Sequence, residues 1–283
     1  MDEQYFEQRS ALTARPAARP EARPELEAVV FDAGGTLVRL DFEWMSEMLG
    51  ELGVRASADD IRRAEVHGRR RYDAAAGQWP NTPAMGIHPP IGSVGPSQAY
   101  FAGMLEAVGC RHPLLDEALE WLRARQVPPS FLWDRPMEGA RQALDGLATL
   151  GVRAACISNS DGRAELHLVK HGLRDGLEFV VDSQLVGVEK PDPRIFGMAL
   201  DRLGLARTPE RAIYVGDIRS VDLAGSRAAG MHFVLIDPFG DYAPAGQLAV
   251  RRLDDLPATL AANFKLIPRP AAGNPGRSAP THS

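Results

Sequence analysis

The chain has 283 residues, of which 45% are hydrophobic and 24% charged, with a formal net charge of −5. These values are typical of a folded globular protein, long enough for one large α/β domain with an inserted module or for two ordinary domains. The negative balance excludes a generally basic surface, so we expect no nucleic-acid partner. Cys110 and Cys156 form no CxxC or zinc pattern, and no secretory or long apolar segment occurs. We expect a cytoplasmic chain without structural disulfides or a membrane partner.

The two ends of the chain differ in composition from the rest. Residues 1–25 are rich in Arg, Ala, Pro and Glu and show no apolar periodicity. Residues 267–283 are rich in Pro, Gly, Ala and Ser. Because such segments bury little apolar surface, we expect a disordered leader and a disordered tail.

Five short apolar runs predict β-strands, and helical patterns lie between most of them. The runs are Leu26–Asp32, Val152–Ile157, Phe179–Val181, Ala212–Val215 and Phe233–Ile236. Strands that alternate with helices indicate a parallel sheet with helices on both faces and ligands at the carboxyl ends of the strands. We therefore predict a Rossmann-like three-layer α/β core formed by residues 26–40 and 133–266.

The alternation stops between the first strand and the second, where four helical patterns follow one another. They cover Glu43–Leu52, Ser57–Ala76, Ser97–Val108 and Leu114–Arg125. Ser57 is a suitable N-cap, with Asp60 three residues later, and Pro113 precedes the last helix. Residues 41–132 are therefore predicted to form an inserted helical cap. Within it, five prolines and four glycines between Gly77 and Pro96 predict a long loop.

Polar residues end or closely follow several of the predicted strands. The segments are Asp32-Ala33-Gly34-Gly35-Thr36, Ile157-Ser158-Asn159, Lys190 within Val188–Pro193, and Val215-Gly216-Asp217 with Asp222 five residues on. The carboxyl ends of parallel strands meet at one edge, so we expect these side chains to converge. Asp32 is placed where a nucleophile would be, at the end of a buried strand and before glycines that let the backbone approach a ligand closely.

These four segments, in this order, resemble the four motifs of the haloacid dehalogenase superfamily. The likeness covers Leu26–Leu40 and Pro136–Pro238. It implies a hydrolase with a helical cap of the C1 type. In such a hydrolase a carboxylate attacks phosphorus and forms an aspartyl phosphate, which divides one hard displacement into two.

The resemblance also implies a role for each motif residue. Asp32 would be the nucleophile, and a magnesium ion would be held by the Asp32 carboxylate, the Gly34 carbonyl and Asp217. The phosphoryl group would be bound by Ser158 and Lys190, which are also counted as catalytic, and by Thr36 and Asn159. Asp222 would orient Lys190 or the metal ligands. The expected partner is a small phosphorylated metabolite, because a cap encloses the site.

Gly34 departs from the pattern of phosphatases in this family, which have a second aspartate at this position. That aspartate protonates the leaving oxygen and later activates water. General acid and base catalysis contributes about 10² to 10⁴ in rate, so we expect a slow enzyme. Acyl and aryl phosphates are then favoured as substrates, unless a cap residue, a bound water or Asp161 supplies the proton. Gly34→Asp is expected to speed breakdown of the intermediate.

Two alternatives accompany the phosphatase prediction. The 2-haloacid dehalogenase branch also lacks the second aspartate, and Phe31-Asp32-Ala33 resembles its opening motif. That branch has tyrosine in place of Gly34 and uses no metal, whereas Gly216-Asp217 matches the metal-dependent branch. The second alternative is a catalytically impaired phosphate-binding or interaction module. The sequence indicates no oligomeric state.

The remaining polar residues receive no catalytic role. His167, His171 and His232 are predicted to lie on helix surfaces or to pack, and His67 and His88 have no partners spaced for a metal site. The run Arg69–Arg71 is interpreted as a solvated helix face that, on a cap, could also meet an anionic substrate.

Overall fold

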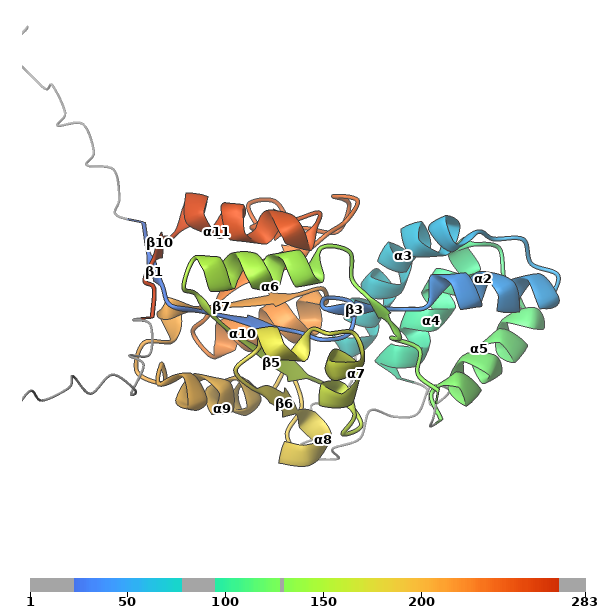
Figure 1. Ribbon diagram of the computed structural model, residues 1–283. Helices are drawn as coiled ribbons and strands as arrows, with labels where there is room; N and C mark the ends of the chain where they lie inside the picture. Colours follow the sequence, from blue (N-terminus) through green and yellow to red (C-terminus); the bar gives the residue numbers. More distant parts are fainter. Residues whose placement is uncertain (1–22, 78–94, 128–129, 270–283) are drawn as a thin grey trace, which may run out of the picture.

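A six-stranded parallel sheet forms the centre of the molecule in the computed structural model, which describes residues 23–77, 95–127 and 130–269 (Figure 1). In spatial order its strands are β6 (Val180–Asp182), β5 (Arg153–Ser158), β2 (Ala28–Phe31), β7 (Ala212–Gly216), β8 (His232–Ile236) and β9 (Ala249–Val250). Every neighbouring pair is parallel. The predicted α/β fold with a central parallel sheet is confirmed. Strand β9 was not predicted, because two residues are too few to show a period.

Helices cover both faces of this sheet and produce the three layers visible in Figure 1. On one face, Val29 and Phe31 pack with helices α6 (Ala140–Thr149) and α11 (Leu256–Asn263). On the other, Ala28 and Val30 pack with α9 (Pro193–Leu203). All of β2 is buried, which explains why it reads as a continuous apolar run.

Shorter elements complete the core. They are α7 (Ala164–Lys170), α8 (Ser183–Val186), α10 (Ala224–Ala228), the turns of 3₁₀ helix η1 (Arg174–Gly176), η2 (Pro209–Arg211) and η4 (Leu253–Asp255), and the π-helical turn η3 (Arg219–Leu223). Turn η3 follows β7 directly, and α10 continues from it and contacts α9. This arrangement places the segment after β7 at the same edge of the sheet as the segment after β2.

Within the described ranges, four helices form an insertion beside the sheet, to the right in Figure 1. They are α2 (Phe42–Glu51), α3 (Ala58–Ala76), α4 (Pro96–Ala107) and α5 (Leu114–Arg125). The insertion leaves the core after β3 (Val38–Arg39) and returns through β4 (Arg135–Pro136), and these two strands pair in antiparallel. Ser57 and Asp60 form a capping box at the start of α3, as predicted. The expected loop lies largely outside the described residues, which omit 78–94.

The insertion has its own hydrophobic core. Met45 and Met48 of α2 pack in one cluster with Phe101 and Leu105 of α4, and all four side chains are buried. Cys110 is buried in this cluster and Cys156 in the core of the sheet, and both are free thiols, as expected.

The first and last strands of the described residues pair with each other at one end of the molecule. Strand β1 (Glu25–Leu26) lies parallel to β10 (Lys265–Leu266), and the Ile267 amide donates to the Leu26 carbonyl. The described residues include 23–25 and 267–269, which lie in the segments expected to form the leader and the tail. The rest of the expected leader and tail, residues 1–22 and 270–283, lies outside the described residues.

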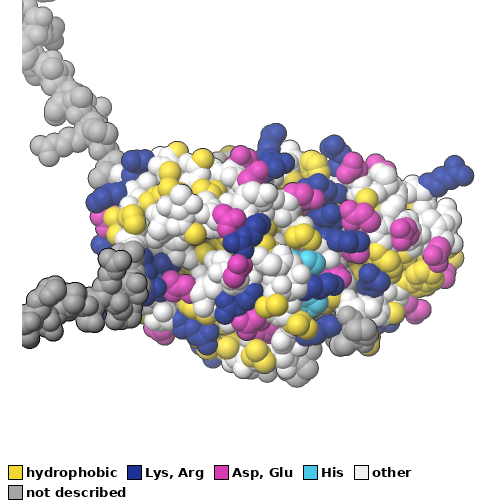
Figure 2. Space-filling model, viewed as in Figure 1, with side chains coloured by type: hydrophobic (Ala, Val, Ile, Leu, Met, Phe, Trp, Pro, Cys, Tyr) yellow, Lys and Arg dark blue, Asp and Glu magenta, His cyan; other side chains and the backbone are white. Residues whose placement is uncertain are grey.

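Charges of both signs are mixed over the face shown in Figure 2. Lys and Arg side chains alternate there with Asp and Glu side chains. Among the described residues, no helix combines the length and the apolar character needed to cross a membrane.

Candidate active site

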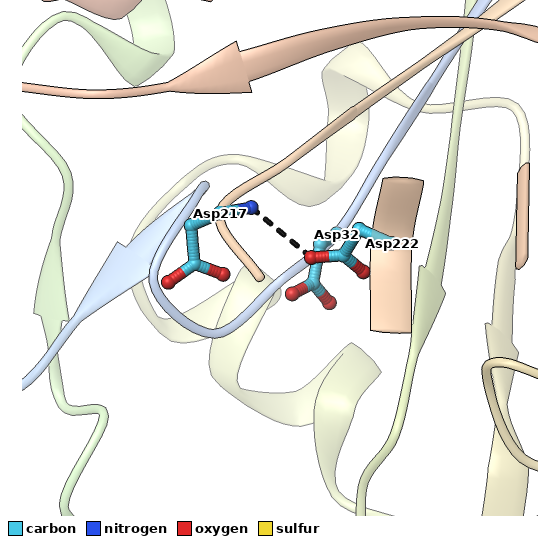
Figure 3. A group of neighbouring side chains, drawn as sticks. All are labelled: Asp32, Asp217 and Asp222. Atoms are coloured by element: carbon cyan, nitrogen blue, oxygen red, sulfur yellow. Dashed lines mark hydrogen bonds between the residues drawn. The ribbon is translucent and has the colours of Figure 1, made fainter. Parts of the chain in front are cut away.

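Three polar residues meet where neighbouring strands end. Asp32 follows β2, Ser158 ends β5 and Asp217 follows β7, and β2 lies between the other two strands. Their relative exposures are only 7%, 5% and 3%. Figure 3 shows the carboxylates of Asp32 and Asp217 close together, with that of Asp222 beside them. Strand order therefore brings together side chains that are far apart in the sequence.

Lys190 is the cation at the centre of this group. Its Nζ lies 2.7 Å from Asp32 Oδ1 and donates to Asp222 Oδ1 at 2.8 Å and to the Tyr214 hydroxyl at 2.9 Å. Burial opposes the charged form, but Asp222 and Asp32 outweigh it and raise the pKa of Lys190. The side chain is therefore an ammonium held against the Asp32 carboxylate.

The Lys190 backbone is held in place by Asn159. Asn159 Oδ1 accepts from the Lys190 amide at 2.8 Å, and its Nδ2 donates to the Lys190 carbonyl at 2.9 Å. The amide side chain is thus committed to the lysine loop. Any contact of Asn159 with substrate would use its backbone.

Asp222 connects the lysine to the loop after β7. Its Oδ2 accepts from the amides of Asp217 at 3.0 Å and Ile218 at 2.9 Å, while Oδ1 accepts from Lys190. Figure 3 marks the bond from the Asp217 amide. Both oxygens accept hydrogen bonds, so this fully buried carboxylate orients its neighbours.

The turn after Asp32 approaches Asp217 so closely that it requires glycine. Gly35 has φ +80°, in the region that favours glycine, and a Cβ there would lie 2.3 Å from Asp217 Oδ2. The Gly35 amide donates to the Val38 carbonyl at 2.7 Å, which closes the turn. A side chain at this position would push the two carboxylates apart.

The carboxylates fit a hard divalent cation. Asp32, Asp217 and Asp222 each offer an oxygen, and these oxygens lie within 4.8 Å of one another. Asp217 Oδ1 is buried without a hydrogen-bond partner among the described residues. Burial, despite nearby Lys190, raises the pKa of Asp32 to about 7, and burial also raises that of Asp217 despite Arg69. A cation would satisfy the unpaired oxygen and favour the ionised carboxylates.

Arg69 reaches into this cluster from helix α3. Its Nε lies 3.3 Å from Asp217 Oδ2, and its other nitrogens donate to the Ile236 carbonyl at 3.0 Å and to Glu65 Oε2 at 3.3 Å. The side chain is buried, whereas Arg70 and Arg71 are exposed. The interpretation of this run as a solvated helix face is therefore wrong for Arg69.

A cavity of about 400 Å³ opens between the sheet edge and the helical insertion. Asp32, Ser158, Asn159, Lys190 and Asp217 line it on the core side. Five aromatic side chains also line it: Tyr72, Tyr100, Phe101, Phe131 and Trp133. Asp32 Oδ2 accepts no hydrogen bond from the described chain, whereas Oδ1 accepts from the Ala33 amide at 2.7 Å. The unengaged oxygen is thus available to a bound molecule.

Thr36 lies away from this cavity. Its side chain is fully buried, it is absent from the cavity wall, and its hydroxyl has no hydrogen-bond partner within the described ranges. The structure thus separates Thr36 from the other residues predicted to bind substrate.

The structure also shows the surroundings of Asp161, considered above as a proton donor, and of His167, predicted to lie on a helix surface or to pack. Burial alone would raise the pKa of Asp161, but its ion pair with Arg163, at 2.6 Å, lowers it, so the carboxyl is a poor acid. His167 stacks on Phe131 at 3.7 Å, and both its ring nitrogens are buried without a partner among the described residues. Burial lowers its pKa, consistent with the packing role predicted for it.

The sequence indicated no site role for Tyr214 or Trp133, and for Arg69 only the possible role of meeting an anionic substrate from the cap. A signal existed for Arg69, because Glu65 and Arg69 continue the helical spacing of four from buried Ile61. The sequence signal for Tyr214 was weaker, because it is only a hydroxyl within an apolar strand. In the structure this hydroxyl donates to the Ile157 carbonyl at 3.1 Å. Trp133 lies in an irregular segment without a periodic pattern, so nothing local marked it.

A family model and several proteins of known name are similar to this chain. Residues 26–230 match the model for haloacid dehalogenase-like hydrolases. Haloacid dehalogenase-like hydrolase domain-containing protein 3 of Mus musculus is 43% identical over 106 residues, which are 38% of this chain and 41% of that protein. A phosphoserine phosphatase of Thermus thermophilus is 37% identical over 122 residues, 41% of this chain and 47% of that protein. The chain thus spans less than half the length of these two relatives.

A solved structure shows the same fold. The L-2-haloacid dehalogenase of Xanthobacter autotrophicus superposes with a TM-score of 0.51 at 19% identity, over 85% of this chain and all of that one. At this identity the likeness concerns the fold alone. The family model covers well over half of the sequence, including the strand ends that carry Asp32, Ser158 and Asp217 and the loop that carries Lys190. The chain belongs to the haloacid dehalogenase-like hydrolase family.

Proposed function

We propose that this hydrolase is a magnesium-dependent phosphatase that acts on a small phosphorylated metabolite through an aspartyl phosphate on Asp32. The observation that carries the proposal is the buried cluster of Asp32, Lys190 and Asp217 on one wall of a 400 Å³ cavity. A carboxylate nucleophile needs positive charge around the phosphoryl oxygens, and Lys190 lies 2.7 Å from it. The similarity to a phosphoserine phosphatase supports the same chemistry.

In the proposed reaction each residue has a defined task. Asp32 Oδ2 attacks phosphorus, and the electron pair of the broken P–O bond leaves with the substrate oxygen. Lys190 and the Ser158 hydroxyl interact with the phosphoryl oxygens as charge spreads over them. Asn159 holds the lysine loop, and Asp222 holds the lysine ammonium. Water then attacks the aspartyl phosphate and releases Asp32.

The metal in this proposal is magnesium, and the carboxylates Asp32 and Asp217 with the Gly34 carbonyl would hold it. When bound, such an ion supplies positive charge to the phosphoryl oxygens and fixes their orientation. The unpartnered Asp217 Oδ1 supports this assignment. Thr36 keeps a lesser role in this proposal, as support for the first turn, since it does not line the cavity.

The size of the cavity favours a small substrate. A wall made of both sheet edge and helical insertion leaves little room for a nucleic acid or a folded phosphoprotein. We propose the cytoplasm as the location of this activity, on the sequence features described above.

The test compares the wild type with Asp32→Asn, using para-nitrophenyl phosphate and magnesium. We expect turnover by the wild type, loss of turnover with Asp32→Asn or with EDTA, and unchanged turnover with Asp116→Asn. Asp116 is an exposed carboxylate on α5 and is the matched control. Equal activity of the wild type and Asp32→Asn would exclude the covalent mechanism.

The same proteins distinguish the alternatives. Halide release from a 2-haloacid by the wild type, with no phosphate release, would support the dehalogenase. The dehalogenase-like fold leaves this alternative open. If neither substrate reacts but inorganic phosphate raises the melting temperature, a phosphate-binding module is the better description.

A further inference from the structure

The space beside Gly34 is filled by the indole ring of Trp133. Trp133 Cδ1 and Nε1 would each lie 3.3 Å from a Cβ on residue 34, and Cε2 would lie 3.6 Å from it. These two residues are far apart in the sequence, and Trp133 belongs to the segment that returns from the helical insertion to the core. A second carboxylate at position 34 would have to project into this ring. Gly34 and the Trp133 indole therefore belong to one local arrangement.

The ring is held in this position by its neighbours. Its centroid lies 5.8 Å from that of Phe101 in an edge-to-face geometry and 6.2 Å from that of Phe131 in a tilted one. Trp133 also packs against the hydrophobic clusters of both the sheet and the insertion. The indole edge therefore has a defined position relative to Gly34.

Among the residues that the structure describes, the Trp133 indole N–H has no hydrogen-bond partner. The side chain is half-buried, and the N–H of a buried tryptophan usually finds an acceptor. Trp133, Gly34, Asp32 and Lys190 all line the same cavity. A molecule held between Asp32 and the aromatic wall is therefore the available acceptor.

We propose that the Trp133 indole N–H donates a hydrogen bond to the leaving oxygen of the substrate, and that the substrate is the phosphate monoester of an aromatic alcohol. This inference rests on the proposed phosphatase function. Indole is a donor only and cannot give up its proton. A donor at this place stabilises negative charge on the departing oxygen, and the aromatic wall, with Phe101 and Phe131, packs against its ring.

The two steps balance without a proton shuttle. In the first, a bond forms between Asp32 Oδ2 and phosphorus while the bond to the bridging oxygen breaks, and the alcohol leaves as an aryloxide with the electron pair. In the second, the oxygen of water attacks phosphorus and the Asp32 carboxylate leaves. Both hydrogens of that water remain on the phosphate product. Only leaving groups stable as anions react well by this route, and aryloxides are such groups.

The test uses Trp133→Phe, which keeps an aromatic ring and removes the N–H. We expect its kcat for phenyl phosphate, a poor leaving group, to fall about tenfold, the effect of one neutral hydrogen bond. For dinitrophenyl phosphate, a good leaving group, we expect a change of less than about twofold, since little stabilisation is needed. The dependence of kcat on the acidity of the alcohol therefore becomes steeper. Trp121→Phe on α5 is the matched control and should leave both rates unchanged.

A second measurement does not depend on turnover. The Asp32→Asn protein, labelled with ¹⁵N, should show four indole N–H signals, one for each tryptophan. The signal absent from Asp32→Asn/Trp133→Phe should shift when phenyl phosphate and magnesium are added, and the others should not.

The outcomes separate this inference from the proposed function. If Asp32→Asn is inactive but Trp133→Phe slows all aryl phosphates equally or none of them, the indole donor is refuted and the phosphatase remains. An unshifted Trp133 signal with bound substrate would also refute it. If Asp32→Asn is as active as the wild type, the phosphatase mechanism itself fails.

Discussion

At the scale of single residues, the site divides into positions that the sequence identifies and positions that it does not. Asp32, Ser158 and Asp217 were predicted because each stands at the end of a strand that could be recognised as an apolar run. Their convergence follows from a parallel sheet. The contact between Gly34 and Trp133 could not be predicted, because it joins two loops whose approach depends on how the insertion returns to the core.

This contact changes the expectation for Gly34→Asp. The sequence alone predicts faster breakdown of the intermediate, but a Cβ at position 34 would lie 3.3 Å from an indole that is packed on both sides. We now expect the single variant to be destabilised by about 1–3 kcal/mol through overpacking and to show no faster breakdown. Gly34→Asp/Trp133→Leu, which has room for the carboxyl, should hydrolyse the intermediate faster than Trp133→Leu alone.

The measurement is the decay rate of the phosphorylated protein after rapid mixing with para-nitrophenyl phosphate, with urea unfolding for stability. Trp133→Leu separates loss of the indole from gain of the acid. A gain in the single variant equal to that in the double variant would show that the indole moves aside at little cost.

At the scale of secondary-structure elements, long periodic segments were predicted well and short ones were not. Helix α3 begins after Ser57 as its capping box indicated. Strands β1, β3, β4, β9 and β10 have two residues each, too few for alternation to show. The face by which α3 docks was also hidden, because three consecutive arginines looked alike although only the first is buried.

Helix α3 is joined to the core through charged contacts as well as apolar ones. Arg69 faces Asp217, and Asp73 accepts from Arg219 Nε at 2.9 Å and from the Ser220 amide at 2.9 Å. The Tyr242 hydroxyl donates to Asp73 at 2.6 Å. These bonds reach the loops after β7 and β8, so the position of the insertion and the charge balance of the candidate metal site are linked.

We predict that Arg69→Gln destabilises the protein, and that magnesium restores part of the loss. Removal of one partner from a buried ion pair costs about 3–5 kcal/mol, because the remaining charge is uncompensated. A divalent ion beside Asp217 supplies positive charge, so the melting temperature should rise more on adding magnesium to the variant than to the wild type. Thermal unfolding in EDTA and in magnesium measures both effects.

Arg70→Gln is the control, because Arg70 is the exposed neighbour of Arg69 on the same helix and does not contact Asp217. It should match the wild type in both conditions. An Arg69→Gln loss of the same size with and without magnesium would mean that the arginine and the ion do not act on the same carboxylate.

At the scale of the whole molecule, the sheet, the insertion and the paired ends form one structure. The predicted layers followed from alternating strands and helices, but the pairing of β1 with β10 could not be predicted. It joins residues far apart in the sequence through the backbone amides of Lys265 and Ile267, which donate to the Pro24 and Leu26 carbonyls. Local patterns contain no information about such a distant partner.

We predict that a chain ending at Phe264 is less stable than one ending at Arg269 by about 3 kcal/mol. The shorter chain loses hydrogen bonds from the Lys265, Ile267 and Arg269 amides to the Pro24, Leu26 and Gly151 carbonyls, each contributing about 1 kcal/mol. Urea unfolding of the two chains measures the difference. Lys265→Ala in the longer chain removes only an exposed ion pair with Glu25 and should change stability little. Equal midpoints for the two chains would show that β10 is dispensable.

The paired ends lie at the side of the sheet away from the helical insertion, as Figure 1 shows. A surface linker attached next to Arg23 or Arg269 would therefore leave the cavity facing outward. Immobilised copies should accept substrate as readily as free ones. The same geometry allows a fluorescent reporter to be fused at either position without shielding the entrance.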